Sequence, residues 1–227
     1  MCKKIFLLLV VSISFTHLLA AQQHTDSLKA NKRSYISLGL GISRGVGKFG
    51  QSASVSQRDG FALTGLNIQL ERVVFGSHNA GFGLTAGRFT NALDGDMYVS
   101  GFSGNPKVSD AKPWRTLYLM TGPYITIPTR YIDIDFKCVG GFLFVKRPSF
   151  TLTYPDQSHS YYTSSSSKAS FGLNMGSNIR LKMSDKTQFK IGIDYITSTA
   201  NIKDDNYSFK QKLNVFNISW GLVFLMN

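Results

Sequence analysis

The stretch ASFGLNMGSNIRLKM, residues 169–183, alternates apolar side chains with small or polar ones along most of its length. The apolar positions are Phe171, Leu173, Met175, Ile179, Leu181 and Met183, and the opposite positions are Ser170, Gly172, Asn174, Gly176, Asn178, Arg180 and Lys182. Successive side chains of a β-strand point to opposite faces, whereas a helix would scatter both sets around its surface. The stretch is therefore predicted to be a strand with one apolar and one polar face.

The same period of two recurs through the rest of the chain. It appears in residues 34–43, 60–75, 81–89, 114–127, 131–145, 188–196 and 211–226. Together with residues 169–183, these stretches predict eight strands. Residues 114–127 are the ambiguous case, because both of their faces are apolar and Pro123 interrupts them.

The connections between these strands alternate in length. Short turns are predicted at residues 76–79, 128–130 and 184–187, and long loops at 44–59, 90–113, 146–167 and 201–210. With up-and-down connectivity, the long loops all lie at one end, and the short turns and both chain termini lie at the other. An even number of strands with this asymmetry is typical of outer-membrane barrels.

The composition fits a folded chain built from alternating strands. Of 227 residues, 43% are hydrophobic and 17% are charged, which excludes disorder. Two cysteines exclude a disulfide scaffold. A mean hydropathy of -0.04 is low for a helical membrane protein. Alternation explains the value, because each strand averages an apolar row of side chains with a polar row.

The N-terminal segment has the pattern of an export signal. Lys3 and Lys4 precede an apolar stretch over residues 5–15, and small residues end at Ala21. We predict that residues 1–21 are a cleaved signal peptide, 22–33 a flexible leader and 34–227 a barrel domain. Polar residues in the apolar stretch disfavour the alternative of a retained membrane anchor. Removal of the two lysines lowers the formal charge from +12 to +10.

Periodicity alone does not say which face of the strands points inward. A soluble lipocalin-like barrel would bury the apolar face, whereas a membrane barrel would turn it to lipid. The polar face is rich in Gly, Asn and Ser, which suit a narrow, filled lumen. Its charges have both signs, so they can pair inside a barrel. This predicted lumen network consists of Glu71, Asp133, Asp135, Lys137, Arg180, Lys182, Lys190 and Asp194.

Aromatic residues near the strand ends support the membrane interpretation, since Tyr and Trp prefer the boundary between lipid and water. The candidates for such a girdle are Tyr35, Trp114, Tyr131, Tyr195, Trp220 and Phe224. Cys138 is in phase with Phe136 and Phe142, so we expect it to face lipid as an inert residue.

The C-terminal stretch resembles the terminal signal that the barrel assembly machinery reads in outer-membrane barrels. Ser219, Gly221, Phe224 and Met226 occupy its polar, glycine, aromatic and hydrophobic positions, and Asn227 follows where that signal usually ends. Residues 34–227 as a whole resemble the outer-membrane β-barrel family of small porin-like and OmpA- or OmpX-like proteins. The resemblance implies an all-β, eight-stranded antiparallel up-and-down transmembrane β-barrel in the cell outer membrane, and says less about activity.

No residue pattern predicts catalysis, a metal or a cofactor. His24, His78, His159 and Cys138 do not have the spacing of metal ligands. The serine-rich residues 164–167 lie in one loop with His159 and Asp156, and this composition indicates a solvated loop and not a catalytic site. The acids expected at the rim, Asp94, Asp96, Asp204 and Asp205, have no His on a strand beside them. The glycines of residues 39–50 are followed by no predicted helix, which argues against a nucleotide loop.

The lysines and arginines are spread over loops, turns and lumen, which argues against nucleic acid as a partner. We expect partners among outer-membrane lipids, and expect basic rim residues to pair with lipopolysaccharide phosphates. These residues are Arg44, Lys48, Arg58, Lys146, Arg147, Lys203 and Lys210. The expected function is structural, adhesive or ligand-binding at the cell surface, with an unidentified external ligand. A narrow channel for small solutes is the first alternative and a lipid A-modifying enzyme the second.

Overall fold

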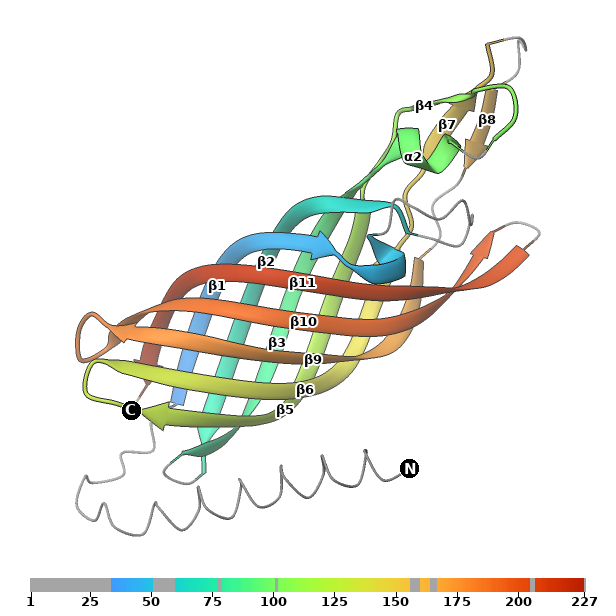
Figure 1. Cartoon of the computed structure of the whole chain (residues 1–227). Helices are drawn as coiled ribbons and strands as arrows, with labels where there is room; N and C mark the ends of the chain where they lie inside the picture. The colour runs from blue at the N-terminus through green and yellow to red at the C-terminus, as the bar shows by residue number, and fades with distance from the viewer. Residues whose placement is uncertain are drawn as a thin grey trace, which may run out of the picture. The chain divides into compact units, whose positions relative to one another are not determined.

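Eight long antiparallel strands form a closed ring in the computed structural model (Figure 1). They are β1 (Ser34–Gly45), β2 (Ala62–Phe75), β3 (Ala80–Leu93), β5 (Trp114–Pro128), β6 (Ile132–Lys146), β9 (Ser167–Lys182), β10 (Thr187–Asp204) and β11 (Tyr207–Met226). The structure describes residues 34–50, 60–76, 79–100, 102–155, 160–163, 167–204 and 207–226. The predicted signal peptide and leader lie outside these residues.

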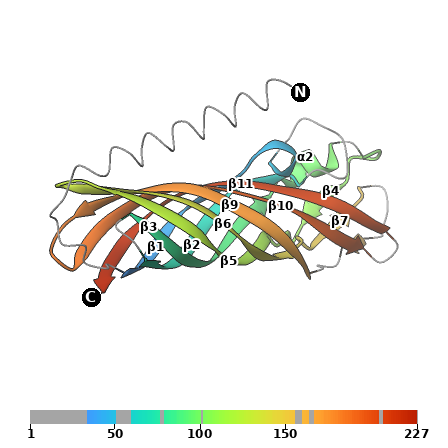
Figure 2. The ribbon, with the colours of Figure 1, turned by 90° about the horizontal axis from the view of Figure 1, so that it is seen from below.

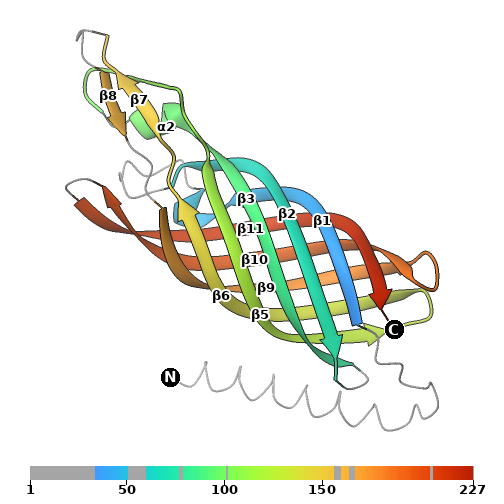
Figure 3. The ribbon, with the colours of Figure 1, turned by 180° about the vertical axis from the view of Figure 1, so that it is seen from behind.

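Each strand of the ring pairs with two neighbours, in the order β1-β11-β10-β9-β6-β5-β3-β2. All eight predicted strands are present and connect in up-and-down order, and the three predicted short turns join β2 to β3, β5 to β6 and β9 to β10. The strands run obliquely around the ring (Figure 2). In Figure 3, β9, β10 and β11 cross behind β1, β2 and β3. Such tilt is required to close a sheet of this size.

Closure depends on the pairing of β1 with β11. Gly39 lies opposite Gly221 in this register. A Cβ atom on Gly221 would stand 2.0 Å from the carbonyl oxygen of Leu38, so the two backbones approach more closely than any other residue allows. The glycine of the C-terminal stretch therefore has a structural role in joining the first and last strands.

Two of the long loops contain regular structure that the sequence analysis did not predict. The connection from β3 to β5 holds α2 (Gly95–Val99) and β4 (Lys107–Ser109), and the connection from β6 to β9 holds β7 (Phe150–Thr153) and β8 (Ser160–Thr163). The three short strands form a separate sheet in the order β4-β7-β8. Figure 1 shows this sheet and α2 at the end of the ring away from the C-terminus. We call α2, β4, β7 and β8 the loop domain.

The loop domain is held together by aromatic contacts. Tyr98 of α2 packs edge-on against Phe150 of β7, with ring centroids 4.8 Å apart, and against Phe61 at 5.7 Å. The carboxylate of Asp94 caps α2 by accepting from the backbone N–H of Met97 at 3.1 Å. The long connection from β1 to β2 begins with the 3-10 helix η2 (Gly47–Phe49). Phe49 of this helix is buried against Trp114.

The prediction of a long loop at residues 201–210 is wrong. β10 and β11 stay paired through this region, as far as Asp204 opposite Tyr207. Polar residues suggested a loop, but ladder hydrogen bonds are made by the backbone and tolerate polar side chains at an exposed sheet end. Among the described residues, no helix has the length and apolar composition needed to cross a membrane.

Candidate functional site

The ring interior contains a first ion cluster centred on Glu71 of β2. Its carboxylate accepts hydrogen bonds from the Nζ atoms of Lys137 and Lys190, each at 2.5 Å, and from the hydroxyl of Ser37 at 3.0 Å. Lys137 Nζ also forms an ion pair with Asp194 Oδ1 at 2.7 Å. All five residues are buried. Glu71 thus joins β2 to β6 and β10, which lie on different sides of the ring.

A second interior cluster surrounds Arg180 of β9. Its guanidinium binds both oxygens of Asp135, at 2.7 and 2.9 Å, and donates to Gln188 Oε1 at 2.6 Å. It also lies over the ring of Tyr35, 4.6 Å from the centroid. The Tyr35 hydroxyl donates to Asp135 at 3.0 Å. This bidentate pair with a stacked aromatic ring is the arrangement for which a planar guanidinium is suited.

Lys182 and Asp133 extend the second cluster toward the short-turn end, with an ion pair of 3.1 Å. The structure thus places all eight residues of the predicted lumen network in these two clusters. Seven of the eight are buried, whereas Lys182 is exposed at the end of β9. Four carboxylates face four cations, so the charges of the two clusters balance. This balance matters because a buried charge without a partner would cost several kcal/mol, on the order of 3–5.

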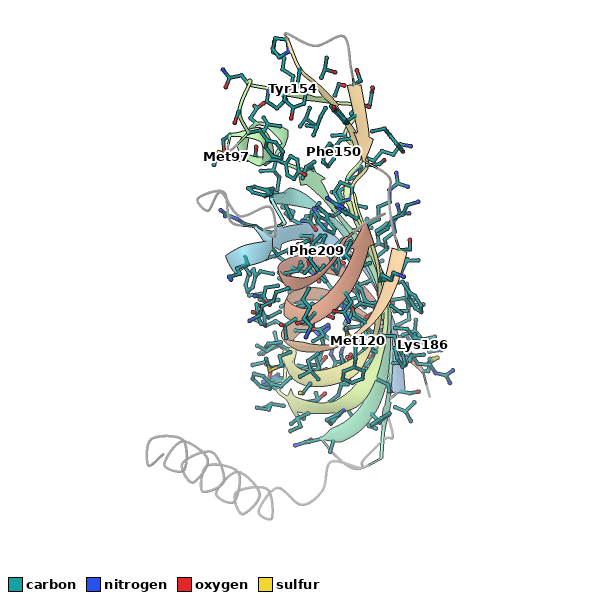
Figure 4. All side chains as sticks on the ribbon, turned by 90° about the vertical axis from the view of Figure 1, so that its right-hand side faces the viewer. Met97, Met120, Phe150, Tyr154, Lys186 and Phe209 are labelled. Carbon is teal, nitrogen blue, oxygen red and sulfur yellow. The ribbon has the colours of Figure 1, made fainter. Side chains whose placement is uncertain are left out.

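Apolar side chains fill another part of the interior, toward the loop end. They are Phe89, Tyr118, Met120, Val139, Leu143, Val145, Ile196, Leu213 and Val215. Each is at most 3% exposed, so this layer is packed like a protein core. Met120 of this layer is labelled among the side chains drawn in Figure 4. Sequence analysis did not find this layer, because these residues are as apolar as those on the outer face.

Several buried amides lie beside the ion clusters and the apolar layer, with Asn178 opposite Asp135 and Asn174 opposite Val139 in the register of β6 and β9. Both side-chain polar atoms of Asn174, Asn178 and Asn217 lack a hydrogen-bond partner among the described residues. Asn217 is opposite Asp194 in the register of β10 and β11. Because burial of an unpaired amide is costly, these groups favour bound water inside the ring.

The outer face of the ring is apolar around its circumference. Large side chains exposed there include Leu38, Leu66, Ile68, Leu70, Phe82, Leu84, Leu117, Leu119, Phe136, Phe142, Phe144, Phe171, Leu173, Ile191, Ile193, Ile218 and Leu222. Cys138 is exposed on the same face of β6. Among the strand residues whose side chains are described, no Asp or Glu points outward. These acids and the exposed apolar side chains therefore occupy opposite faces of the sheet.

Only some residues of the predicted aromatic girdle lie on the outer face of the ring. Tyr131, Trp220 and Phe224 are exposed, and Tyr195 is half-buried. The prediction is wrong for Tyr35 and Trp114, which are buried inside the ring. Tyr35 is in phase with the polar row of β1, where its hydroxyl reaches Asp135, and Trp114 Nε1 donates to the carbonyl of Gly60 at 2.8 Å. Buried aromatic rings with a polar group need such partners.

The residues of the predicted C-terminal signal lie on the last strand, β11. Ser219 is buried in the interior, Gly221 approaches β1, and Phe224 points outward. Met226 ends the strand opposite Ser34. The side chain that an assembly factor would contact, Phe224, is thus on the outer face, and recognition by the assembly machinery stays a prediction.

The candidates for metal binding and catalysis fall mainly on parts of the chain that the structure does not describe. These are His24, His78, Asp156, His159 and residues 164–166. Within the described residues, no group of three His, Cys, Asp or Glu side chains is placed to hold a metal ion. Asp94 serves as the cap of α2, and Asp96 is exposed in the same helix.

The predicted basic rim is partly visible. Arg44, Lys48, Lys146 and Lys210 are exposed, and the guanidinium of Arg147 lies over the ring of Phe209 at 5.5 Å. Arg58 and the side chain of Lys203 lie outside the described residues. Sequence analysis overlooked several exposed cations on the outer face, among them Arg88 of β3 and Arg115 of β5. Inward and outward side chains alternate along each strand, so the positions of Arg88 and Arg115 in that alternation would have identified them as outward-facing.

No family model and no curated protein matches the chain. Among solved structures, it is similar to small outer-membrane β-barrel proteins. The attachment invasion locus protein Ail of Yersinia pestis is 14% identical, with a TM-score of 0.49 and coverage of 86% of this chain and 99% of Ail. Neisserial surface protein A is 8% identical, with the same TM-score and coverage. OprG of Pseudomonas aeruginosa is 11% identical, with a TM-score of 0.43 and coverage of 87% and 97%.

From the ion pairs of Glu71 we predict that its replacement destabilises the protein strongly, and that the loss depends on the presence of Lys190. Replacing Glu71 by Leu leaves Lys190 without a carboxylate, while Lys137 keeps Asp194. We expect Glu71→Leu to lower the free energy of unfolding by about 3–5 kcal/mol. Urea unfolding of the protein refolded in lipid vesicles measures this change.

The matched variant is Glu71→Leu with Lys190→Met, which removes the unpaired cation as well. It should regain most of the lost stability, because an apolar replacement of a buried ion pair is often neutral. An equal loss in the single and double variants would contradict the assignment of Glu71 as the partner of Lys190.

Proposed function

We propose that the chain is an integral outer-membrane β-barrel that presents its loop domain outside the cell for adhesion or ligand binding. The observation that carries the proposal is the segregation of side chains: the paired charges of the two ion clusters lie in the ring, and the outer face has large apolar side chains around its circumference. In water, each exposed Leu, Ile or Phe of the outer face would forgo on the order of 1 kcal/mol of burial. In a bilayer, the same residues meet hydrocarbon.

The soluble lipocalin-like alternative requires the opposite arrangement. Such a barrel has an apolar ligand cavity and a water-compatible outer face. Here the outer face has no acidic residue among the strand side chains that the structure describes, and the interior holds Glu71, Asp135 and their cationic partners. Closed pairing of all eight strands also satisfies the backbone hydrogen bonds, which lipid requires of any spanning strand.

A surface role is supported by the loop domain. Its α2 and its sheet are joined by the packing of Tyr98 on Phe150, so two long loops form one structured unit. Tyr161 and Tyr162 of β8 are 58% and 67% exposed. Tyrosine is enriched at binding interfaces because it offers a large rigid surface together with a polar group. We place this unit on the outer side of the membrane, where long barrel loops lie.

The proposed role is non-catalytic, and the lipid A-modifying enzyme remains the weakest alternative. A narrow channel has one observation in its favour, the unpaired amides of Asn174, Asn178 and Asn217, which favour water inside the ring. The apolar layer that includes Leu143 and Met120 opposes it, because these buried side chains occupy interior space toward the loop end. A plugged barrel is therefore the better interpretation.

Cys138 provides a direct test of membrane insertion. In a Cys2→Ser background, it is the only cysteine of the chain, and it lies on the outer face. We expect a membrane-impermeant maleimide added to intact proteoliposomes to leave Cys138 unlabelled, because lipid covers it. Labelling after unfolding in detergent should be complete.

The control for this test is Ser184→Cys combined with Cys138→Ser, which moves the thiol to an exposed short turn. Vesicles that hold the turn on the outside should label rapidly. Equal labelling of Cys138 and of the turn cysteine in folded protein would contradict the membrane-spanning proposal.

Conductance separates the plugged barrel from the channel. We expect the purified protein in planar bilayers to give no discrete current steps, because Leu143, Met120 and their neighbours fill the interior. A porin reconstituted in the same way is the positive control. Reproducible unitary steps that scale with the amount of inserted protein would contradict the plugged interior.

A further inference from the structure

Three cations stand on neighbouring strands at the loop end of the outer face. Arg115 of β5 lies directly opposite Lys146 of β6, and Arg88 of β3 lies opposite Leu117, one step along β5 from Arg115 on the same face. All three side chains are exposed. We call Arg88, Arg115 and Lys146 the cation triad.

The pairing of Arg115 with Lys146 is unfavourable in isolation. Side chains directly opposite on antiparallel strands have Cβ atoms about 4.5–5.5 Å apart, and like charges at that distance destabilise a sheet. In the described part of the chain, no carboxylate forms an ion pair with any member of the triad. The eight charges of the two ion clusters, by contrast, are balanced. The triad is thus the place where positive charge is concentrated without compensation.

An apolar surface begins directly beside the triad. Leu117 and Phe144 are opposite each other in the register, each two residues from Arg115 and Lys146 respectively. They are 55% and 53% exposed. A ligand that fits this surface has an anionic head group for the cations and hydrocarbon for Leu117 and Phe144.

We propose that the triad binds the phosphate of a phosphorylated glycolipid of the outer leaflet, namely the lipid A part of lipopolysaccharide. This inference rests on the proposed function, which places the outer face in that leaflet. Two guanidinium groups and an ammonium supply charge-assisted hydrogen bonds to phosphate oxygens and relieve the repulsion between Arg115 and Lys146. The acyl chains pack on Leu117 and Phe144. The continuous apolar surface favours a lipid over free phosphate.

The triad differs from the basic residues that the sequence analysis selected. Lys146 belongs to both sets, whereas Arg88 and Arg115 lie within predicted or observed strands and not in loops. Arg44 is also exposed on the outer face but sits on β1, opposite Phe216 and Thr64 and apart from the triad. The inferred site therefore spans β3, β5 and β6 only.

Native mass spectrometry of the mature protein in detergent micelles tests the site. The probe is bisphosphorylated lipid A, titrated against the parent protein and the variant Arg88→Gln, Arg115→Gln, Lys146→Gln. We expect the triple variant to bind lipid A about a hundredfold more weakly, because the loss of each cation should weaken binding about fivefold. The charge-matched control is Arg72→Gln, Arg130→Gln, Lys186→Gln, which removes three exposed cations toward the short-turn end and should bind as the parent does.

Unchanged binding in the triad variant, or an equal loss in the control variant, would overturn the proposal. Dephosphorylated lipid A should bind the parent as weakly as lipid A binds the triad variant. Inorganic phosphate at millimolar concentration should not displace lipid A, and full displacement would overturn the choice of a lipid ligand. Failure of the proposed function is distinguished separately, since labelling of Cys138 in vesicles would then reveal a protein outside the bilayer.

Discussion

The ion pairs of Glu71 with Lys137 and Lys190 are the interaction on which the rest of the structure depends. They join β2, β6 and β10 across the interior of the ring. A carboxylate and two ammonium groups are tolerated there only because each meets an opposite charge. When the charged faces of β2, β6, β9 and β10 are inside, alternation leaves the apolar faces of these strands outside. The apolar character of the outer face therefore follows from the pairing of charges in the interior.

The strands and the interior charges could be predicted from the sequence, because a period of two assigns each side chain to a face. Asp133, Asp135 and Arg180 lie on the polar row of their strands, and the structure brings them together. The prediction of Tyr35 as a girdle residue is wrong because it relied on residue type, whereas the alternation along β1 places Tyr35 on the inward row. The hairpin at residues 201–210 was missed because backbone pairing leaves little trace in polar side chains. The loop domain depends on contacts between distant segments, such as Tyr98 with Phe150, which periodicity does not encode.

The interior and the loops together favour a surface role over transport. Toward the short-turn end, the ion clusters hold the strands in register, and toward the loop end, Leu143, Met120 and Phe89 fill the ring. The longest strands, β10 and β11, reach beyond this layer, and the loop domain is a second structured unit. A rigid, filled barrel that supports ordered loops is suited to present a binding surface. The cation triad then fixes the barrel in the leaflet from which that surface extends.

The central claim is that the outer face meets lipid, and the two tryptophans of the chain test it most directly. Trp220 is 46% exposed on the outer face, whereas Trp114 is 3% exposed inside the ring. Single-tryptophan proteins, made by Trp114→Phe or Trp220→Phe, are reconstituted in vesicles of brominated phospholipid and their fluorescence is compared with that in unbrominated vesicles. The account predicts strong quenching of Trp220 and little quenching of Trp114. Equal quenching of the two, or none of Trp220, would contradict it.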